Sequence, residues 1–333
     1  MLNSFLGVLF FMGMLSGVWF SIHSDSWLGV WVGLELNLVC FIPLMIQGDS
    51  MSSEPSVKYF LVQACASFLL LFSGASLMNY KEGMKMLILI SLLLKLGAAP
   101  FYVWYLWVGD SLKWLQFLVL STVQKIAPLV LLFFSGVNKG GEILIYLSII
   151  MSGLIGGVGG INEVSLRKLL VFSSLNHMGW MMMPLVSENE FWFIYFLFYC
   201  LMITMTIWIL SLLKLYYLNQ MFSVSVSWAN KLTLMMTFFS LGGLPPLLGF
   251  FPKLVVIESS VGSPMVLNLS FMIMMSVITL FYYLRMGLSV LMLNHLKIKS
   301  NLMFFKKFSV TIILLVTLLG AETSTFLFQS FLQ

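Results

Sequence analysis

The run MKMLILISLLLKLGAAPFYVWYL at residues 84–106 decides what kind of fold this chain can adopt. It is apolar for long enough to cross the roughly 30 Å hydrocarbon core of a bilayer. Yet Lys95 stands at its centre, and Pro100 follows one helical turn later. Proline inside a helix removes a backbone hydrogen bond and clashes with the preceding turn. The run therefore predicts a membrane-spanning helix that is broken beside a buried charge.

The composition of the whole chain agrees with this local pattern. Of its 333 residues, 60% are hydrophobic and only 9% are charged, whereas soluble proteins carry about 25% charged residues. The mean hydropathy is +1.03. A soluble fold of this size cannot bury so much apolar surface, so soluble enzymes, nucleic-acid-binding proteins and disordered proteins are excluded.

Hydropathy predicts one polytopic membrane domain, residues 1–333, with eleven spans. The spans cover residues 2–21, 27–46, 57–79, 84–106, 114–136, 142–162, 165–186, 190–217, 232–258, 264–293 and 308–332. A β-barrel is excluded because the runs are continuously apolar rather than alternating. The expected fold is an all-α integral membrane bundle of about eleven transmembrane helices.

The basic residues in the loops and at the ends of the spans predict the orientation. Three lie on the side opposite the N-terminus: Lys81, Lys85 and Lys139. Ten lie on the side of the N-terminus: Lys58, Lys113, Arg167, Lys168, Lys214, Lys231, Lys297, Lys299, Lys306 and Lys307. Cytoplasm-like faces carry the excess of Lys and Arg. The N-terminus is therefore expected on that face, the matrix in a mitochondrion, and the C-terminus on the other.

Charges inside the spans carry most of the functional information. Lys95 and Lys125 stand at the midpoints of their spans, Glu35 lies within two residues of its midpoint, and Lys253 lies in the ninth span. A central charge costs roughly 2.5 to 3.5 kcal/mol on the insertion scale, so these groups must face the bundle interior and find partners or water. Lys95 or Lys125 could pair with Glu35. A buried ion pair that only fixes helix packing is one interpretation. A proton relay is favoured, because the lysines outnumber the acids and burial makes an ammonium group easier to deprotonate.

The helices that carry these lysines contain breaks. Pro100 follows Lys95, Pro128 follows Lys125, and the ninth span holds GGLPP at 242–246 before Lys253. Freed carbonyls in lipid need protein or a cavity beside them. The broken fourth and ninth spans are an odd number of spans apart and so have opposite orientations. This arrangement is typical of the inverted repeats of transporters, although the order of lysine and proline differs between the two.

Other polar groups within the spans allow two interpretations each. His177, in SSLNH at 173–177, either bridges charged sites or only packs, since histidine titrates near neutrality. Glu322 is expected to be a packing or surface group, and Arg285 to reach toward an interface. Glycines at 153–160 are expected to permit close helix contact. No cysteine or histidine spacing predicts a metal site.

Several motifs follow one another along the chain in a specific order. They are SWLG at 26–29, GLELN at 33–37, EPSVKY at 54–59, KLGAAPF at 95–101, QKIAP at 124–128, SLRK at 165–168, SSLNHMGW at 173–180, GGLPP at 242–246, GF at 249–250 and PK at 252–253. In this order the whole chain resembles the antiporter-like, proton-pumping subunits of mitochondrial respiratory complex I (NADH:ubiquinone oxidoreductase), in the animal subunit 2 family. That family has eleven spans and a matrix N-terminus, whereas its bacterial relatives have fourteen spans.

The resemblance implies a role for each buried charge. Glu35 and Lys95 would form the coupled ion pair, Lys125 would be the central relay lysine, and Lys253 would end the polar axis, with His177 a further relay candidate. The chain itself would bind no cofactor and no metal. NADH, FMN, iron–sulphur clusters and ubiquinone would bind to partner subunits of the enzyme, a proton-translocating NADH:ubiquinone reductase of the mitochondrial inner membrane.

The resemblance also implies partners within that complex. They would be the antiporter-like subunit 4, the small 4L subunit, the lateral helix of subunit 5, and membrane lipids such as cardiolipin. No nucleic acid is expected. Two other functions stay open from the sequence: a free-standing cation/proton antiporter of the same fold, and a purely structural spanning subunit.

Overall fold

The computed structural model describes residues 5–46, 53–76, 81–136, 139–187, 189–223, 228–245, 247–261 and 265–292. Within these ranges the regular elements are helices, apart from one isolated β-bridge between Ser165 and Tyr217. The chain divides into two compact units, Met1–Ser152 and Gly153–Gln333. The expected all-α class is confirmed.

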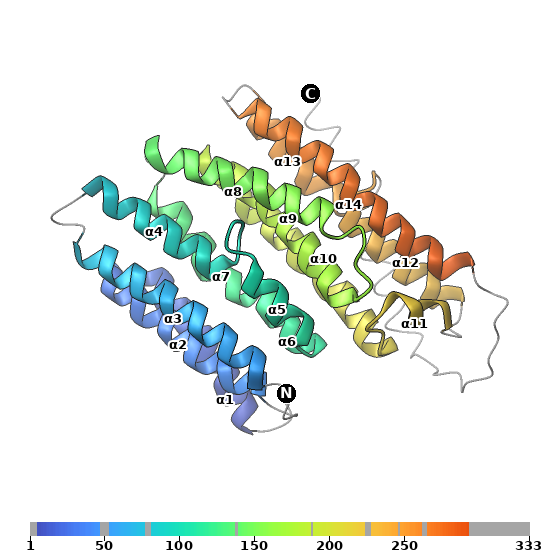
Figure 1. The fold of residues 1–333 in the computed structure, drawn as a ribbon, viewed down its shortest axis with the longest axis horizontal. Helices are drawn as coiled ribbons and strands as arrows, with labels where there is room; N and C mark the ends of the chain where they lie inside the picture. The colour runs from blue at the N-terminus through green and yellow to red at the C-terminus, as the bar shows by residue number, and fades with distance from the viewer. Residues whose placement is uncertain are drawn as a thin grey trace. The chain divides into compact units, whose positions relative to one another are not determined.

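The helices of the first unit, drawn in blue to green in Figure 1, contact one another in a closed ring. The unit contains α1 (Phe5–His23), α2 (Trp27–Ile46), α3 (Ser53–Ser76), α4 (Lys81–Leu96), α5 (Val103–Ser111), α6 (Trp114–Ser121), α7 (Val123–Ser135) and the first part of α8 (Lys139–Val158). α1 contacts α2, α2 contacts α3, α3 contacts α4, α4 contacts α7, and α7 contacts α1, which closes the ring. α5 packs on α3. The ring encloses a shared interior for the charged residues of α2, α4 and α7.

Two glycines let α1 and α2 touch through their backbones. A Cβ atom on Gly17 would lie 2.8 Å from the backbone nitrogen of Asn37, and one on Gly33 would lie 2.6 Å from that of Ser21. Small residues allow this close approach where lipid offers no hydrophobic driving force between helices. This contact restricts sliding of α2 along α1, and so fixes the position of Glu35 along the helix pair.

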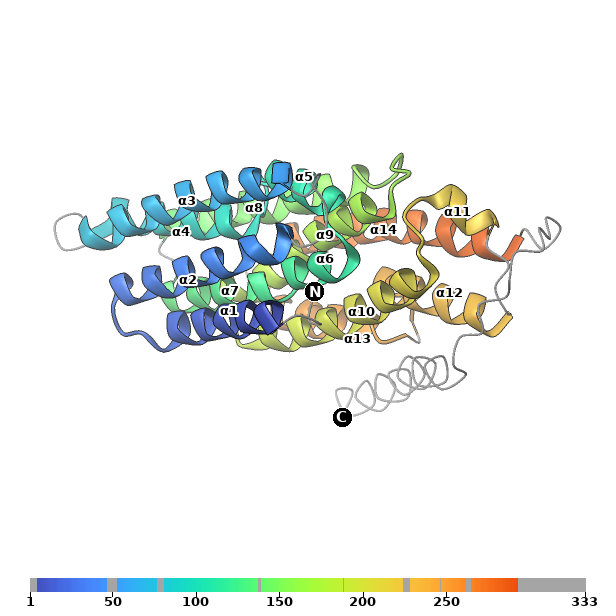
Figure 2. The same cartoon turned by 90° about the horizontal axis from the view of Figure 1, so that it is seen from below.

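The second unit is built around α9. It contains α9 (Leu166–Val186), α10 (Phe191–Leu213), α11 (Leu218–Ser223), α12 (Trp228–Gly242), α13 (Phe250–Ser260), α14 (Val266–Met292) and the end of α8. α9 contacts α10, α13 and α14, and α12 packs on α10 and α14. The short α11 lies beside α14 (Figure 2). α9 is buried along nearly all of its length, as expected for a helix that is apolar on all sides.

The glycines at 153–160 have the packing role that the sequence predicts. A Cβ atom on Gly156 would lie 2.6 Å from the backbone nitrogen of Asn176 in α9, and one on Gly153 would lie 2.6 Å from the sulphur of Met272 in α14. The end of α8 therefore contacts the backbone of α9 directly.

Two of the predicted spans are interrupted in the structure. Within the described ranges, eight helical segments are long and apolar enough to cross a membrane by length and composition. The predicted spans 84–106 and 232–258 are each interrupted, the first between α4 and α5 and the second between α12 and α13. The eleventh predicted span, 308–332, lies outside the described residues.

One predicted break is in a different place. α7 continues through Pro128, and the interruption falls upstream at Thr122, between α6 and α7. There the N–H and the hydroxyl of Thr122 both donate to the carbonyl of Leu118, at 3.0 and 2.7 Å. The bond that Pro128 cannot make would reach Gln124, only the second residue of α7. Pro128 therefore lies near the start of α7, where few intrahelical bonds exist to be lost, and it does not break the helix as it would in a helix interior.

Candidate functional site

The end of α4 is set by a glycine. Gly97 has a φ of +67°, in the left-handed region that favours glycine. The N–H groups of Gly97 and Ala98 donate to the carbonyls of Leu94 and Leu93, each at 3.2 Å. This is the Schellman pattern of helix ends. It places Lys95 in the last turn of α4.

Side chains from two other helices donate to carbonyls in the last turn of α4. Nε2 of Gln63, in α3, donates to the carbonyl of Lys95 at 3.1 Å. Nε1 of Trp104, in α5, donates to the carbonyl of Leu94 at 3.1 Å. Backbone carbonyls without water need such partners. The helix end is therefore bonded by uncharged groups, and the Lys95 ammonium is not needed for that purpose.

Glu35 interacts electrostatically with the interior of the ring. Its carboxylate acts on the amine of Lys95 and on the hydroxyl of Tyr59. Lys95 is 6% exposed. Within the described residues Glu35 and Lys95 form no direct ion pair, which would need a nitrogen–oxygen distance of 4.0 Å or less. The coupling predicted for Glu35 and Lys95 therefore does not rest on a direct contact among the described residues, and it stays a prediction.

Lys125 is the most buried of the lysines, with 2% of its side chain exposed. It lies in the first turn of α7, just after the interruption at Thr122. Its Nζ is 4.8 Å from the centroid of the Tyr105 ring in α5, within the range of a cation–π interaction. The aromatic face stabilises the protonated amine.

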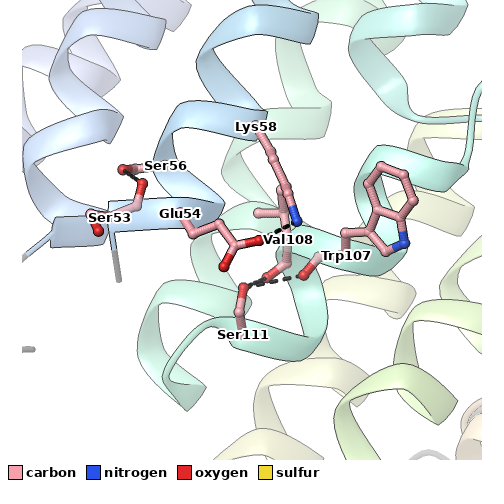
Figure 3. A network of polar contacts seen from close by, with 7 residues as sticks. All are labelled: Ser53, Glu54, Ser56, Lys58, Trp107, Val108 and Ser111. Carbon is pink, nitrogen blue, oxygen red and sulfur yellow. Dashed lines mark hydrogen bonds and ion pairs between the residues drawn. The ribbon is translucent and has the colours of Figure 1, made fainter. Parts of the chain in front are cut away.

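Lys58 shows what an ordinary lysine looks like in the same unit. Its Nζ lies 2.6 Å from Oε1 of Glu54, one turn earlier in α3, and 5.2 Å from the centroid of the Trp107 ring in α5 (Figure 3). Both charged side chains are exposed, at 42% and 75%. Exposed ion pairs of this kind contribute little to the stability of the folded protein. This is the surface position expected of a charge that sets orientation.

The end of α12 in the second unit repeats the end of α4. Gly243 has a φ of +79°. Its N–H donates to the carbonyl of Ser240 at 3.1 Å, and the N–H of Leu244 donates to that of Phe239 at 3.2 Å. This is again the Schellman pattern. The two broken helices therefore share a backbone motif that their lysine and proline positions do not share.

Lys253 itself completes this second helix end. It lies in the first turn of α13, is 6% exposed, and donates from Nζ to the carbonyl of Gly242 at 2.9 Å. Its Nζ is 6.0 Å from the centroid of the Trp180 ring in α9. A Cβ atom on Gly243 would lie only 2.8 Å from this Nζ. The glycine thus both turns the chain and leaves room for the ammonium group.

His177 lies at the centre of α9 and is 2% exposed. Its Nδ1 is 2.9 Å from the hydroxyl oxygen of Tyr195 in α10, and its ring centroid is 5.3 Å from that of Tyr199. The tyrosine hydroxyl can donate to a neutral imidazole or accept from a protonated one. His177 therefore has a partner suited to both protonation states.

The structure brings the predicted residues together in two sets. Glu35, Lys95 and Lys125 belong to the ring of the first unit, and His177 and Lys253 belong to the contacting helices α9 and α13 of the second. The guanidinium of Arg285 is exposed and donates to the carbonyl of Glu163 at 3.2 Å. Glu322 lies outside the described residues. Among the described residues, no group of three or more His, Cys, Asp or Glu side chains could hold a metal ion.

Comparison with known sequences identifies the family. A family model described as "NADH:quinone oxidoreductase/Mrp antiporter, TM" matches residues 24–279. The chain belongs to this family. It is 42% identical over 300 residues to NADH-ubiquinone oxidoreductase chain 2 of Anopheles gambiae and 41% identical over 301 residues to that of Aedes aegypti. Each alignment covers 87% of both proteins. The family expected from the motifs is confirmed.

Solved structures of antiporter-like subunits have the same fold. A chain of respiratory complex I from Thermus thermophilus superposes with a TM-score of 0.84 at 21% identity, over 97% of this chain and 78% of that one. A chain of the Mrp complex from Dietzia superposes with a TM-score of 0.74 at 15% identity, over 84% and 59%. At these identities the likeness shows the fold alone. The expected antiporter-like bundle is thereby confirmed.

Sequence reasoning missed the uncharged partners in this member of the NADH:quinone oxidoreductase/Mrp antiporter family. Gln63, Tyr59 and Trp104 surround the Lys95 break, and Tyr195 binds His177. The sequence does indicate a bonded role for Gln63, because an amide inside an apolar span must find a partner. It does not single out Tyr195, which stands in the aromatic run FWFIYFLFY at 191–199.

Proposed function

We propose that this chain is a proton-translocating subunit of the membrane arm of NADH:ubiquinone oxidoreductase in the mitochondrial inner membrane. Glu35, Lys95, Lys125 and Lys253 would carry the proton relay, with His177 as an intermediate group. Electron transfer would take place in other subunits, which bind NADH, FMN, iron–sulphur clusters and ubiquinone. The names of the relatives support the assignment to that enzyme.

One observation carries the relay itself: three lysines are buried beside helix interruptions. Lys95, Lys125 and Lys253 are 6%, 2% and 6% exposed, and each lies within one turn of an interruption. Desolvation disfavours the ammonium form, while a helix C-terminus favours it for Lys95 and Lys253. For Lys95 and Lys253 the two effects oppose each other, which brings the charged and neutral forms of the amine closer in energy, as a relay requires.

The mechanism follows from charge coupling. Protonation of Glu35, or its movement away from Lys95, removes a negative charge that stabilises the Lys95 ammonium. The change in charge at Lys95 then alters the proton affinity of Lys125 and afterwards that of Lys253. Charges interact over several ångströms when the intervening medium has a low dielectric constant. No redox chemistry is required of this chain.

Partners and orientation extend the same proposal. The neighbours would be subunit 4, the 4L subunit, the lateral helix of subunit 5, and lipids such as cardiolipin. The ten basic residues on the side of the N-terminus support a matrix N-terminus and a C-terminus in the intermembrane space. Solved relatives that come from multi-subunit membrane complexes support a place within such an assembly.

Replacement of Lys125 by methionine tests the proposal. In complex I reconstituted into liposomes, Lys125→Met is expected to lower proton-coupled turnover by about tenfold or more, since a positioned proton-transfer group contributes a factor of this size or greater. Lys58→Met is the matched control, because that lysine is exposed and pairs with Glu54. An assembled Lys125→Met complex that pumps the normal number of protons per electron contradicts the proposal.

A free-standing cation/proton antiporter is the second candidate, and the fold shared with a chain of the Mrp complex favours it. The two candidates differ in what the isolated chain can do. Purified alone into liposomes, an antiporter exchanges Na⁺ or K⁺ against a pH gradient, whereas a complex I subunit does not. A purely structural subunit would instead tolerate neutral replacements at all four charged positions without loss of pumping.

A further inference from the structure

Gln124, the residue before the central lysine, bonds at both ends of its side-chain amide. Its Oε1 accepts a hydrogen bond from the Tyr59 hydroxyl in α3 at 3.2 Å. Its Nε2 donates to Oδ1 of Asn37 in α2 at 2.9 Å and lies 3.4 Å from the sulphur of Met14 in α1. Four helices of the first unit therefore meet at one side chain.

Both protein partners of this amide are fixed in place. Tyr59 is 2% exposed, and its ring packs against Phe41 of α2 and Trp104 of α5, with centroid distances of 5.2 and 5.8 Å. Asn37 is 3% exposed and lies where α1 and α2 touch at Gly17. Buried polar groups of this kind cost free energy if their bonds are lost.

The bridge of Tyr59, Gln124 and Asn37 joins the two halves of the first site. At one end, Asn37 lies two residues after Glu35 in α2. At the other, Gln124 precedes Lys125 in the first turn of α7. The first turn of a helix lacks most intrahelical partners for its N–H groups, and here the N–H of Lys125 reaches the Thr122 carbonyl at 3.1 Å. Side-chain bonds therefore help decide where this turn lies.

We propose that Gln124 is a positioning residue for Lys125, and that the bridge couples the first turn of α7 to α2, the helix that carries Glu35. A movement of α2 at Glu35 shifts Asn37, and Gln124 passes this shift to the first turn of α7. The inference rests on the proposed function, since it assumes that Lys125 relays protons. It adds three uncharged residues whose role is coupling rather than proton transfer.

Gln124→Met tests the proposal, because methionine keeps the length of the side chain and loses both bonds. In assembled complex I in liposomes, we expect the rate of proton-coupled turnover to fall by about two- to tenfold, the loss that one or two buried hydrogen bonds can cause. The number of protons pumped per electron should fall as well. Tyr59→Phe should cause part of the same loss, and the double variant should lose no more than Gln124→Met alone.

Gln116→Met is the matched control. Gln116 is also a buried glutamine of the first unit, whose Nε2 donates to the carbonyls of Leu44 and Met45 at 2.8 and 3.0 Å. It joins α6 to the end of α2 without contact with the charged residues that the site uses. Its loss should lower the amount of assembled complex but leave the protons pumped per electron unchanged.

The outcomes separate this inference from the proposed function. If Lys125→Met lowers pumping while Gln124→Met behaves like Gln116→Met, the bridge is structural and the inference is wrong. If the Tyr59→Phe and Gln124→Met effects simply add, the residues do not act as one bridge and the inference is also wrong. If Lys125→Met itself pumps normally, the proposed function fails first.

Discussion

The two broken helices solve one problem with different chemistry. α4 and α12 both end at a glycine in the left-handed region, Gly97 and Gly243, with the same backbone hydrogen bonds. In the first unit the remaining carbonyls accept from the uncharged Gln63 and Trp104. In the second, the carbonyl of Gly242 accepts from a lysine, Lys253. One lysine stands beside a finished helix end, and the other is part of it.

This difference has a consequence for proton transfer. The helix end beside Lys95 is bonded by Gln63 and Trp104, so the charge of Lys95 can change without loss of a bond to the backbone there. Lys253 bonds to a carbonyl, and charge-assisted bonds are roughly twice as strong as neutral ones. Deprotonation of Lys253 therefore weakens a helix end. If both lysines take part in the proposed relay, a change of charge at Lys253 would alter a backbone bond of its own unit, whereas one at Lys95 would leave its helix end bonded.

The helices that follow the two interruptions, α5 and α13, also differ in how they begin. α5 follows Tyr102, a bulky residue, whereas α13 follows Gly249. A Cβ atom on Gly249 would collide with the backbone carbonyl of Ser240 in α12. The interruption of the second unit is therefore the tighter of the two, with backbone against backbone.

The largest effect is expected where that tightness is removed. Gly249→Ala forces the chain apart at the α12–α13 interruption and should destabilise the second unit by about 3 kcal/mol or more. Little assembled complex should remain, as measured on native gels. Gly83→Ala in α4 is the control, because nothing lies within 4 Å of the added atom. Equal yields of the two variants contradict the packing described for the second unit.

A smaller effect should separate the two lysines. Lys253→Met leaves the carbonyl of Gly242 without its donor and should cost about 1.5 to 3 kcal/mol, seen as faster thermal inactivation of the complex. Lys95→Met leaves its helix end bonded by Gln63 and Trp104 and removes a desolvated ammonium group, so it should stay within about 1 kcal/mol of the unaltered protein. Both variants should pump poorly. Equal thermal stability of the two would show that Lys253 has no structural part.

The sequence predicted the features whose cost is local. Lys95, Lys125 and Lys253 could be found because an ionisable group in an apolar run is expensive wherever the run lies in the fold. The helix interruptions at 97–102 and 243–249 were signalled by glycine and proline together. The repeated unit was harder to see, since the two halves share a glycine-ended helix rather than an order of lysine and proline.

Features that depend on other helices could not be predicted in this way. Gln63 lies 32 residues before the carbonyl that it binds, and Gln124 lies 87 residues after Asn37. No periodicity in one span indicates which neighbour it will meet. The break in the fifth span was placed at Pro128 because proline is a visible signal, yet it lies at Thr122, whose bonds to Leu118 are invisible in a sequence.

The smallest effect concerns the uncharged groups that finish α4. Gln63→Leu removes the donor to the carbonyl of Lys95 and should cost about 1 kcal/mol. Trp104→Phe should cost less for the lost bond, because the carbonyl of Leu94 still accepts from Gly97. Limited proteolysis of the assembled complex would rank the two. If α4 is finished independently of Lys95, Gln63→Leu should slow pumping only as far as it destabilises the helix. A loss of pumping at full stability would instead make Gln63 part of the relay, and the contrast between the two units would disappear.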